Sequence, residues 1–245
     1  MIRYKLTIEY EGTHYFGWQW QAEFKSIQGT IEKAIKDFSR EEVELYAAGR
    51  TDTGVHALGQ VAHFDLERTF PAWQVCQAIN FHLQKEQIII LKAEEVTQDF
   101  HARFSARQRA YCYKILKRPC RPAIDRDRVW HIRQNLDVAA MIEALSLLVG
   151  HHDFSSFRAS GCQALTSQIT VDDIRLEQDG EYLLIFIRAR SFLYHMVRNI
   201  VGSVVEVGLG KISIDEFKRI FEAKDRRLAG VTAPACGLYF LEVVY

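Results

Sequence analysis

The chain has 245 residues, of which 48% are apolar, 25% are charged and 4 are prolines, a composition that favours a folded protein with a sizeable core over a disordered one. Its 31 lysines and arginines balance its 31 aspartates and glutamates, which argues against a general nucleic-acid coat. No apolar run approaches the length of a membrane span, and residues 1–10 alternate like a strand and do not resemble a signal peptide.

In the first hundred residues, alternation of apolar and polar side chains predicts four strands, over residues 2–10, 43–47, 60–66 and 87–92. Helical spacing predicts one helix over residues 27–39 and a second that opens at Pro71, with a stripe of Trp73, Cys76 and Ile79. Residues 15–21, Tyr-Phe-Gly-Trp-Gln-Trp-Gln, form an aromatic loop that is either a lid over the core or a rim of stacking groups.

The composition turns basic near residues 100–105, where we place a boundary between domains 1–105 and 106–245. The second domain is predicted to contain helices over residues 138–148, 192–209 and 213–224, and strands over residues 108–117, 169–177, 181–190 and 237–245. Asp179-Gly180 is a hairpin signal, and Ser213 with Glu216 forms a capping box. The pattern predicts an α+β protein with a mostly antiparallel sheet flanked by helices and an active-site cleft between its two domains.

The stretch from Ala47 to Ala57 is a candidate for chemistry because it carries one acid, Asp52, in a glycine-containing loop between two predicted strands. Arg50 lies two residues earlier, and a nearby cation favours the ionised carboxylate. An ionised carboxylate on a strand-anchored loop serves as a nucleophile or a general base. The alternative is structural, since Asp and Thr beside Gly are ordinary turn formers.

Residues 101–133 hold ten lysines and arginines against two acids, a local charge of +8. Such a run is either a solvated face or, because Phe104, Tyr111, Tyr113 and Trp130 are interleaved with it, a surface that binds phosphates and bases.

Arg198 is the second candidate, because it lies in the largely apolar segment 192–209, in which Glu206 is the only acid. Glu206 is about two helical turns away and reaches Arg198 poorly. Arg198 therefore either pairs with an acid from elsewhere in the fold or extends its charge to solvent at the helix edge.

Metal binding is disfavoured, since His151-His152-Asp153 has no matching ligand cluster elsewhere. The five cysteines, at 76, 112, 120, 162 and 236, are odd in number and form no CxxC motif, which disfavours a zinc ribbon or disulfide framework and predicts a reduced, cytoplasmic protein.

Six stretches together resemble the TruA-type tRNA pseudouridine synthases, in the order of that family and over nearly the full length. They are residues 15–19, 49–57, 104–107 with 111–113, 152–154, 192–202, and 233–239. One departure is Thr53, where the family more often has Ala; the change leaves the carboxylate untouched.

The resemblance implies that uridine at positions 38, 39 and 40 of the tRNA anticodon stem-loop is isomerised to pseudouridine. It implies no cofactor and no metal, a base that leaves its helical stack, and a homodimer in which one tRNA contacts both subunits. Asp52 matches the nucleophile, which attacks either C1′ of the ribose or C6 of the uracil. Tyr111 matches the tyrosine that stacks on the uracil, Arg198 the arginine that pairs with the aspartate, and Arg50 the arginine that supports the extruded base.

Two other classes compete with this interpretation. Asp52-Thr53-Gly54 is also the triplet of aspartic proteases, but those enzymes need two carboxylates that share a proton, and the sequence has one triplet beside a cation. A non-catalytic RNA-binding module explains the basic segment and the aromatics but gives Asp52 no purpose.

Overall fold

The computed structural model describes residues 1–245 as ten strands and five α-helices, divided between two compact units. The N-terminal unit comprises Met1–Arg107 with Tyr239–Tyr245, and the C-terminal unit comprises Gln108–Leu238. The fold is α+β with mostly antiparallel strand pairing, which confirms the predicted class. The division falls after Arg107, and the closing strand belongs to the first unit although the sequence analysis grouped it with residues 106–245. The cleft stays a prediction.

The N-terminal unit is built on five strands, β1 (Ile2–Tyr10), β2 (Tyr46–Ala47), β3 (His56–Leu66), β4 (Ile88–Val96) and β10 (Leu238–Val244). Strand β1 runs antiparallel to both β3 and β4, β2 is antiparallel to β3, and β10 is parallel to β3. The prediction that β3 begins at residue 60 is wrong by four residues. Ala57 already pairs with Tyr10 and Phe240, and these distant partners are absent from the local sequence pattern.

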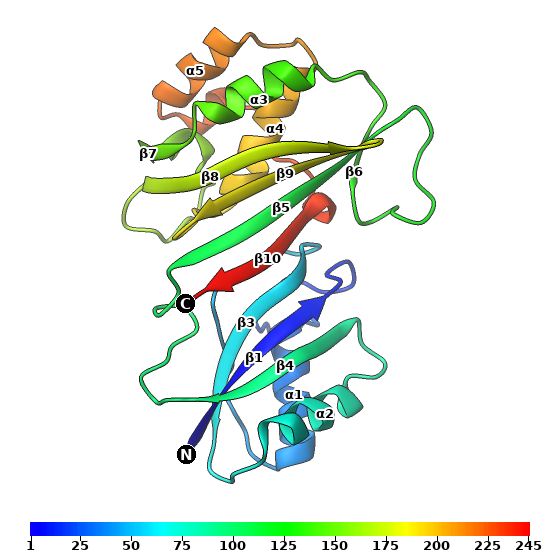
Figure 1. Ribbon diagram of the computed structural model, residues 1–245, viewed down its shortest axis with the longest axis vertical. Coiled ribbons are helices and arrows are strands. Elements are labelled where there is room, and N and C mark those ends of the chain that lie inside the picture. The colour runs from blue at the N-terminus through cyan, green and yellow to red at the C-terminus, as the bar shows by residue number, and fades with distance from the viewer. The chain divides into compact units, whose positions relative to one another are not determined.

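Helices α1 (Ile27–Ser39) and α2 (Ala72–His82) lie side by side against this sheet (Figure 1). The bounds predicted for α1 are confirmed, and Ser26 caps it by accepting a hydrogen bond from the Gly29 N–H. The predicted stripe of α2 is wrong, since Trp73 is 65% exposed while Val75 and Ile79 are buried. Trp73 lies about 200° around the helix from Val75, so the two cannot share the core face.

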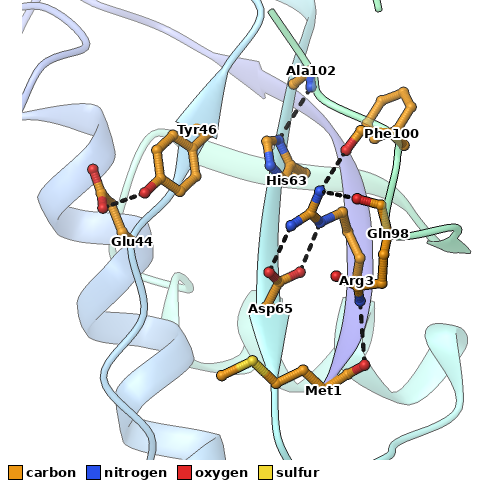
Figure 2. A network of polar contacts seen from close by, with 9 residues as sticks. All are labelled: Met1, Arg3, Glu44, Tyr46, His63, Asp65, Gln98, Phe100 and Ala102. Atoms are coloured by element: carbon orange, nitrogen blue, oxygen red, sulfur yellow. Dashed lines mark hydrogen bonds and ion pairs between the residues drawn. The ribbon is translucent and has the colours of Figure 1, made fainter.

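The other face of the sheet holds a polar network that fastens residues 97–107, the connecting segment, to β1 and β3 (Figure 2). Arg3 binds both carboxylate oxygens of Asp65 at 2.8 Å and donates to the carbonyl oxygens of Gln98 at 2.7 Å and Phe100 at 2.8 Å. The Ala102 N–H donates to Nδ1 of His63 at 3.2 Å. The segment that leaves the first unit is therefore anchored by side chains of two neighbouring strands.

The C-terminal unit contains β5 (Gln108–Lys117), β6 (Trp130–Ile132), β7 (Gly150–Asp153), β8 (Gln168–Asp179) and β9 (Tyr182–Ala189). Strands β5, β9, β8 and β7 pair antiparallel in that order, and β6 is parallel to β5. The predicted hairpin at Asp179-Gly180 is the β8–β9 turn.

Helices α3 (Val138–Ser146), α4 (Met196–Gly208) and α5 (Ile214–Glu222) pack together in this unit (Figure 1). The Ser213 half of the predicted capping box is confirmed, since Ser213 accepts a hydrogen bond from the Glu216 N–H. The prediction that α4 begins at residue 192 is wrong: His195 has a left-handed φ of 58°, so the helix begins at Met196. None of the helices has the length and apolarity that crossing a membrane requires.

Candidate active site

Asp52 lies in the loop between β2 and β3, and hydrogen bonds to β3 hold the start of this loop. The Ala48 N–H donates to the Val61 carbonyl at 2.8 Å, and the Gln60 side chain donates to the Gly49 carbonyl at 2.8 Å. Within the loop, the Val55 N–H donates to the Asp52 carbonyl at 3.1 Å, and β3 begins at the next residue, His56. Asp52 itself is half-buried. Its backbone is thus set by the strands while its side chain keeps access to solvent.

Thr51 anchors the middle of the loop and is 8% exposed. Its hydroxyl shares a 2.7 Å hydrogen bond with the Tyr10 hydroxyl, and its carbonyl accepts from the Trp18 N–H at 3.0 Å. Burial raises the pKa of Tyr10 well above its ordinary value, so Tyr10 remains a neutral hydrogen-bonding group. Gly17, with a φ of 78°, lies so close that a Cβ would come within 2.7 Å of the Thr51 carbonyl oxygen. The residue before Asp52 is therefore held from three sides.

Arg50 lies two residues before Asp52 in the same loop, and it is exposed. The role of Arg50 beside Asp52 stays a prediction.

His56, in the same stretch, is the first residue of β3 and has a structural role. It is 1% exposed, accepts a hydrogen bond at Nδ1 from the Gly12 N–H at 3.0 Å, and stacks on Tyr239 with ring centroids 4.8 Å apart. Because Nδ1 accepts, it carries no proton, and its 3.8 Å approach to Glu11 is not an ion pair. Sequence reasoning missed this role, and that of Tyr10, because their partners are distant in the chain.

Tyr111 lies in β5 of the C-terminal unit and is 9% exposed. Tyr111 packs on Phe192 in an edge-to-face arrangement, with ring centroids 4.8 Å apart and ring planes at 81°. Phe192 comes from the segment before α4. The contact fixes the plane of the Tyr111 ring.

Arg198 is the third residue of α4 and is half-buried. Its Nε donates to the Ala233 carbonyl at 2.8 Å, and the Ala233 N–H donates back to the Arg198 carbonyl at 3.1 Å. Close packing keeps the chain near Ala233 in place, because a Cβ on Gly202 would lie 1.7 Å from the Val231 carbonyl oxygen.

A polar network next to this contact also ties the chain before Ala233 to α4. Arg226 donates to the Asn199 side chain at 3.0 Å and to the Thr232 hydroxyl at 3.0 Å, and the Thr232 hydroxyl donates to Asn199 at 2.7 Å. Sequence reasoning missed Arg226 and Thr232, whose roles depend on this tertiary contact.

The basic segment 101–133 is divided between the two units. Arg103 and Arg107 belong to the N-terminal unit and the remaining eight basic residues to the C-terminal unit. Arg109 is 9% exposed and donates to the Arg190 carbonyl, and Arg118 pairs with Glu181 at 3.1 Å. Of the interleaved aromatics, only Phe104 is largely exposed; Tyr111 and Tyr113 are buried and Trp130 is half-buried, because β5 turns its tyrosines inward.

The His151-His152-Asp153 stretch is structural. Asp153 accepts hydrogen bonds from the Ser155 N–H at 3.0 Å and the Ser155 hydroxyl at 2.6 Å, and His152 bonds to the Val149 carbonyl at 2.8 Å. No group of three or more His, Cys, Asp or Glu side chains is arranged to hold a metal ion.

A family model described as tRNA pseudouridine synthase matches residues 6–105 and 144–245. These ranges include Arg50, Asp52 and Arg198, and Tyr111 lies outside them. The chain belongs to the tRNA pseudouridine synthase family, and it is therefore an enzyme of the isomerase class. This excludes both the protease and the non-catalytic module as the class of the protein.

The relatives are of the TruA type, which confirms the resemblance in the sequence. Proteins called tRNA pseudouridine synthase A from Rhodospirillum centenum and Ehrlichia canis are each 49% identical to this chain, over all of both chains. One from Caulobacter vibrioides is 48% identical over 100% of this chain and 99% of its own. A solved structure titled as a Cbf5-Nop10-Gar1 complex aligns with 96% of this chain and 56% of that chain at 12% identity, with a TM-score of 0.33.

Proposed function

We propose that this enzyme converts uridine to pseudouridine at positions 38, 39 and 40 in the anticodon stem-loop of tRNA. The names of the relatives support tRNA as its substrate. In this reaction the N1–C1′ bond breaks, the uracil turns and a C5–C1′ bond forms, while the proton lost at C5 is balanced by one gained at N1. Neither an oxidant nor a reductant enters this balance, so the proposal includes no cofactor.

The observation that carries the proposal is the loop of Asp52, which presents one half-buried carboxylate from a backbone held by hydrogen bonds. A backbone that is already fixed loses little freedom when the carboxylate attacks, and this favours nucleophilic catalysis. Asp52 attacks C1′ of the ribose or C6 of the uracil. The base must first leave its stack, at a cost of a few kcal/mol that contacts in the pocket offset.

The remaining roles follow the family resemblance. Arg198 pairs with the Asp52 carboxylate, and its anchor on Ala233 supports a fixed guanidinium. Tyr111 stacks on the uracil and helps to remove the C5 proton, and its edge contact with Phe192 supports a fixed ring plane. Arg50 enters the position that the base vacates, which its exposed side chain permits. The active form is a homodimer in which one tRNA contacts both subunits, and the enzyme works in the cytoplasm.

The test is Asp52→Asn, which keeps the size of the side chain and removes its nucleophilic oxygen. We expect pseudouridine formation in a tRNA transcript to disappear, as mapped by carbodiimide treatment and primer extension. The affinity for tRNA should change by less than about tenfold, or roughly 1.4 kcal/mol.

Asp37→Asn, on α1, is the matched control and should retain wild-type activity. Undiminished activity of Asp52→Asn would reject Asp52 as the nucleophile. Modification of uridines outside positions 38–40 would reject the proposed site in tRNA.

A further inference from the structure

The loop over residues 14–25 carries three exposed aromatic side chains that the proposed chemistry does not use. Phe16 is 46% exposed, Trp20 57% and Phe24 44%, and we refer to these three as the aromatic rim. The loop is closed at its base by a hydrogen bond from the Phe16 N–H to the Lys25 carbonyl at 2.9 Å. Gln21 pairs with Phe24 and donates to the Phe16 carbonyl at 3.2 Å.

The aromatic rim is held in place by its own contacts although it faces solvent. The rings of Phe16 and Phe24 lie 4.3 Å apart with their planes at 31°. The Trp20 N–H donates to the Gln28 side chain at 3.0 Å, and its indole lies over Gly29, where a Cβ would meet Cδ1 at 2.7 Å. These contacts leave the exposed aromatic faces with few conformations to lose when a partner binds.

The same loop is in direct contact with the loop that carries Asp52. Gly17 packs against the backbone of Thr51 and Asp52. A Cβ at Gly17 would come within 2.7 Å of the Thr51 carbonyl oxygen and 3.1 Å of the Asp52 carbonyl carbon. The adjacent Trp18 N–H donates to the Thr51 carbonyl at 3.0 Å. The aromatic rim therefore belongs to a loop that packs directly against the loop of Asp52, so one RNA bound at Asp52 has the rim within reach.

The chemistry of the loop favours a flat partner over a protein. Ala22 is the only aliphatic side chain among residues 14–25, whereas exposed glutamines at 19 and 21 offer amide donors and acceptors beside the rings. The one lysine, Lys25, is paired with Glu86 at 2.5 Å, so the loop is not built to hold phosphates. Aromatic faces with amides and little charge are suited to stacking on nucleobases.

We propose that the aromatic rim stacks on unpaired nucleobases of the RNA substrate next to the uridine that reacts at Asp52. This inference rests on the proposed function, because it takes tRNA as the substrate. It adds a binding surface in the N-terminal unit that acts by stacking and not by charge.

The experiment measures the affinity of an unmodified, fluorescently labelled tRNA transcript for wild type, Trp20→Ala, Trp20→Phe and Trp73→Ala. Trp73 is a matched control, since it is an exposed tryptophan in the same unit, on α2. We expect Trp20→Ala to weaken binding about tenfold, while Trp20→Phe, which keeps a ring, and Trp73→Ala stay near wild type. The loss should be the same factor at 50 and 200 mM salt, because stacking releases no counterions.

If Trp20→Ala binds tRNA with wild-type affinity and keeps its turnover, the stacking role of the aromatic rim is rejected, while the proposed function is unaffected. A loss that shrinks at high salt would show an electrostatic contact and would also reject the stacking role. So would a change from dimer to monomer in sedimentation, because the rim would then face a second copy of the chain. Wild-type protein that forms no pseudouridine would instead remove the proposed function, and the rim with it.

Discussion

Arg198 shows at the scale of one residue how the fold can direct a charged group. Its Nε is committed to the Ala233 carbonyl, and Ala233 is bonded back to the Arg198 backbone. The guanidinium is planar, so a bond at Nε sets the plane in which its terminal nitrogens lie. A carboxylate that lies in that plane can accept two parallel hydrogen bonds from the guanidinium.

Arg198→Lys keeps the charge and loses both the plane and the Nε donor. We expect the rate of pseudouridine formation under single-turnover conditions to fall at least tenfold, while tRNA affinity changes little. The free energy of unfolding should fall by about 1–3 kcal/mol, because the Ala233 carbonyl loses its partner. Arg219→Lys, at an exposed position on α5, is the matched control and should change neither quantity. Wild-type turnover and stability of Arg198→Lys would show that the geometry of Arg198 is unimportant.

The sequence identified Asp52 and Arg198 as candidates because each is unusual in its local setting. One is the single acid of a glycine-containing loop, and the other is a cation in an apolar helix. The direction in which a side chain points could not be predicted from the sequence. Arg50 points to solvent, and Arg109 turns inward to the Arg190 carbonyl, because both depend on the tertiary path of the chain.

At the scale of the element, the segments with local signals were predicted closely. Helix α1, the start of α5 and the β8–β9 turn each depend on a cap or turn residue inside the element itself. The start of α4 was missed, because the apolar pattern continues through residues 192–195 while the left-handed backbone of His195 sets the helix start at Met196. Strand β2 is only Tyr46–Ala47, shorter than predicted, because its pairing ends after two residues opposite β3.

The connecting segment 97–107 depends on a buried histidine of β3. His63 is 2% exposed and accepts from the Ala102 N–H, while Tyr46 stacks on its ring with centroids 5.2 Å apart. Burial, with the nearby Arg3 and His101, lowers the pKa of His63 from 6.5 to about 4. In that interval the unfolded chain binds a proton that the folded chain does not. Stability therefore falls as the pH drops from 6.5 to 4.

We expect this residue to contribute at most about 3 kcal/mol to that loss, as measured by chemical denaturation at pH 7, 5.5 and 4. His63→Asn keeps an acceptor for the Ala102 N–H and removes the titrating ring, so its stability should depend less on pH in this window. The nearby carboxyl group of Asp65 does not account for a difference in pH dependence between wild type and His63→Asn, because Arg3 holds the pKa of Asp65 below its ordinary value of 3.8. An unchanged pH dependence in His63→Asn would contradict the assignment.

At the scale of the whole molecule, a formal net charge of zero conceals an uneven distribution. The basic run 101–133 spans both units, and its members have different uses. Arg109 and Arg118 are engaged within the fold. The exposed arginines of this run are six, at 103, 107, 121, 126, 128 and 133. The number of phosphates that the segment can contact is therefore smaller than its sequence suggests.

The affinity for tRNA should fall steeply with salt, since each phosphate contact releases counterions. If about half of the six exposed arginines contact phosphates, affinity should drop on the order of 30-fold between 50 and 200 mM salt. Arg121, Arg126 and Arg128 lie in one loop between β5 and β6, so replacing all three by Gln tests that loop alone. Filter binding over a salt series should give a shallower slope for this variant, whereas Trp20→Ala should keep the wild-type slope. A flat salt response of the wild type would remove the basic segment from the binding surface, and tRNA recognition would then depend on shape and stacking.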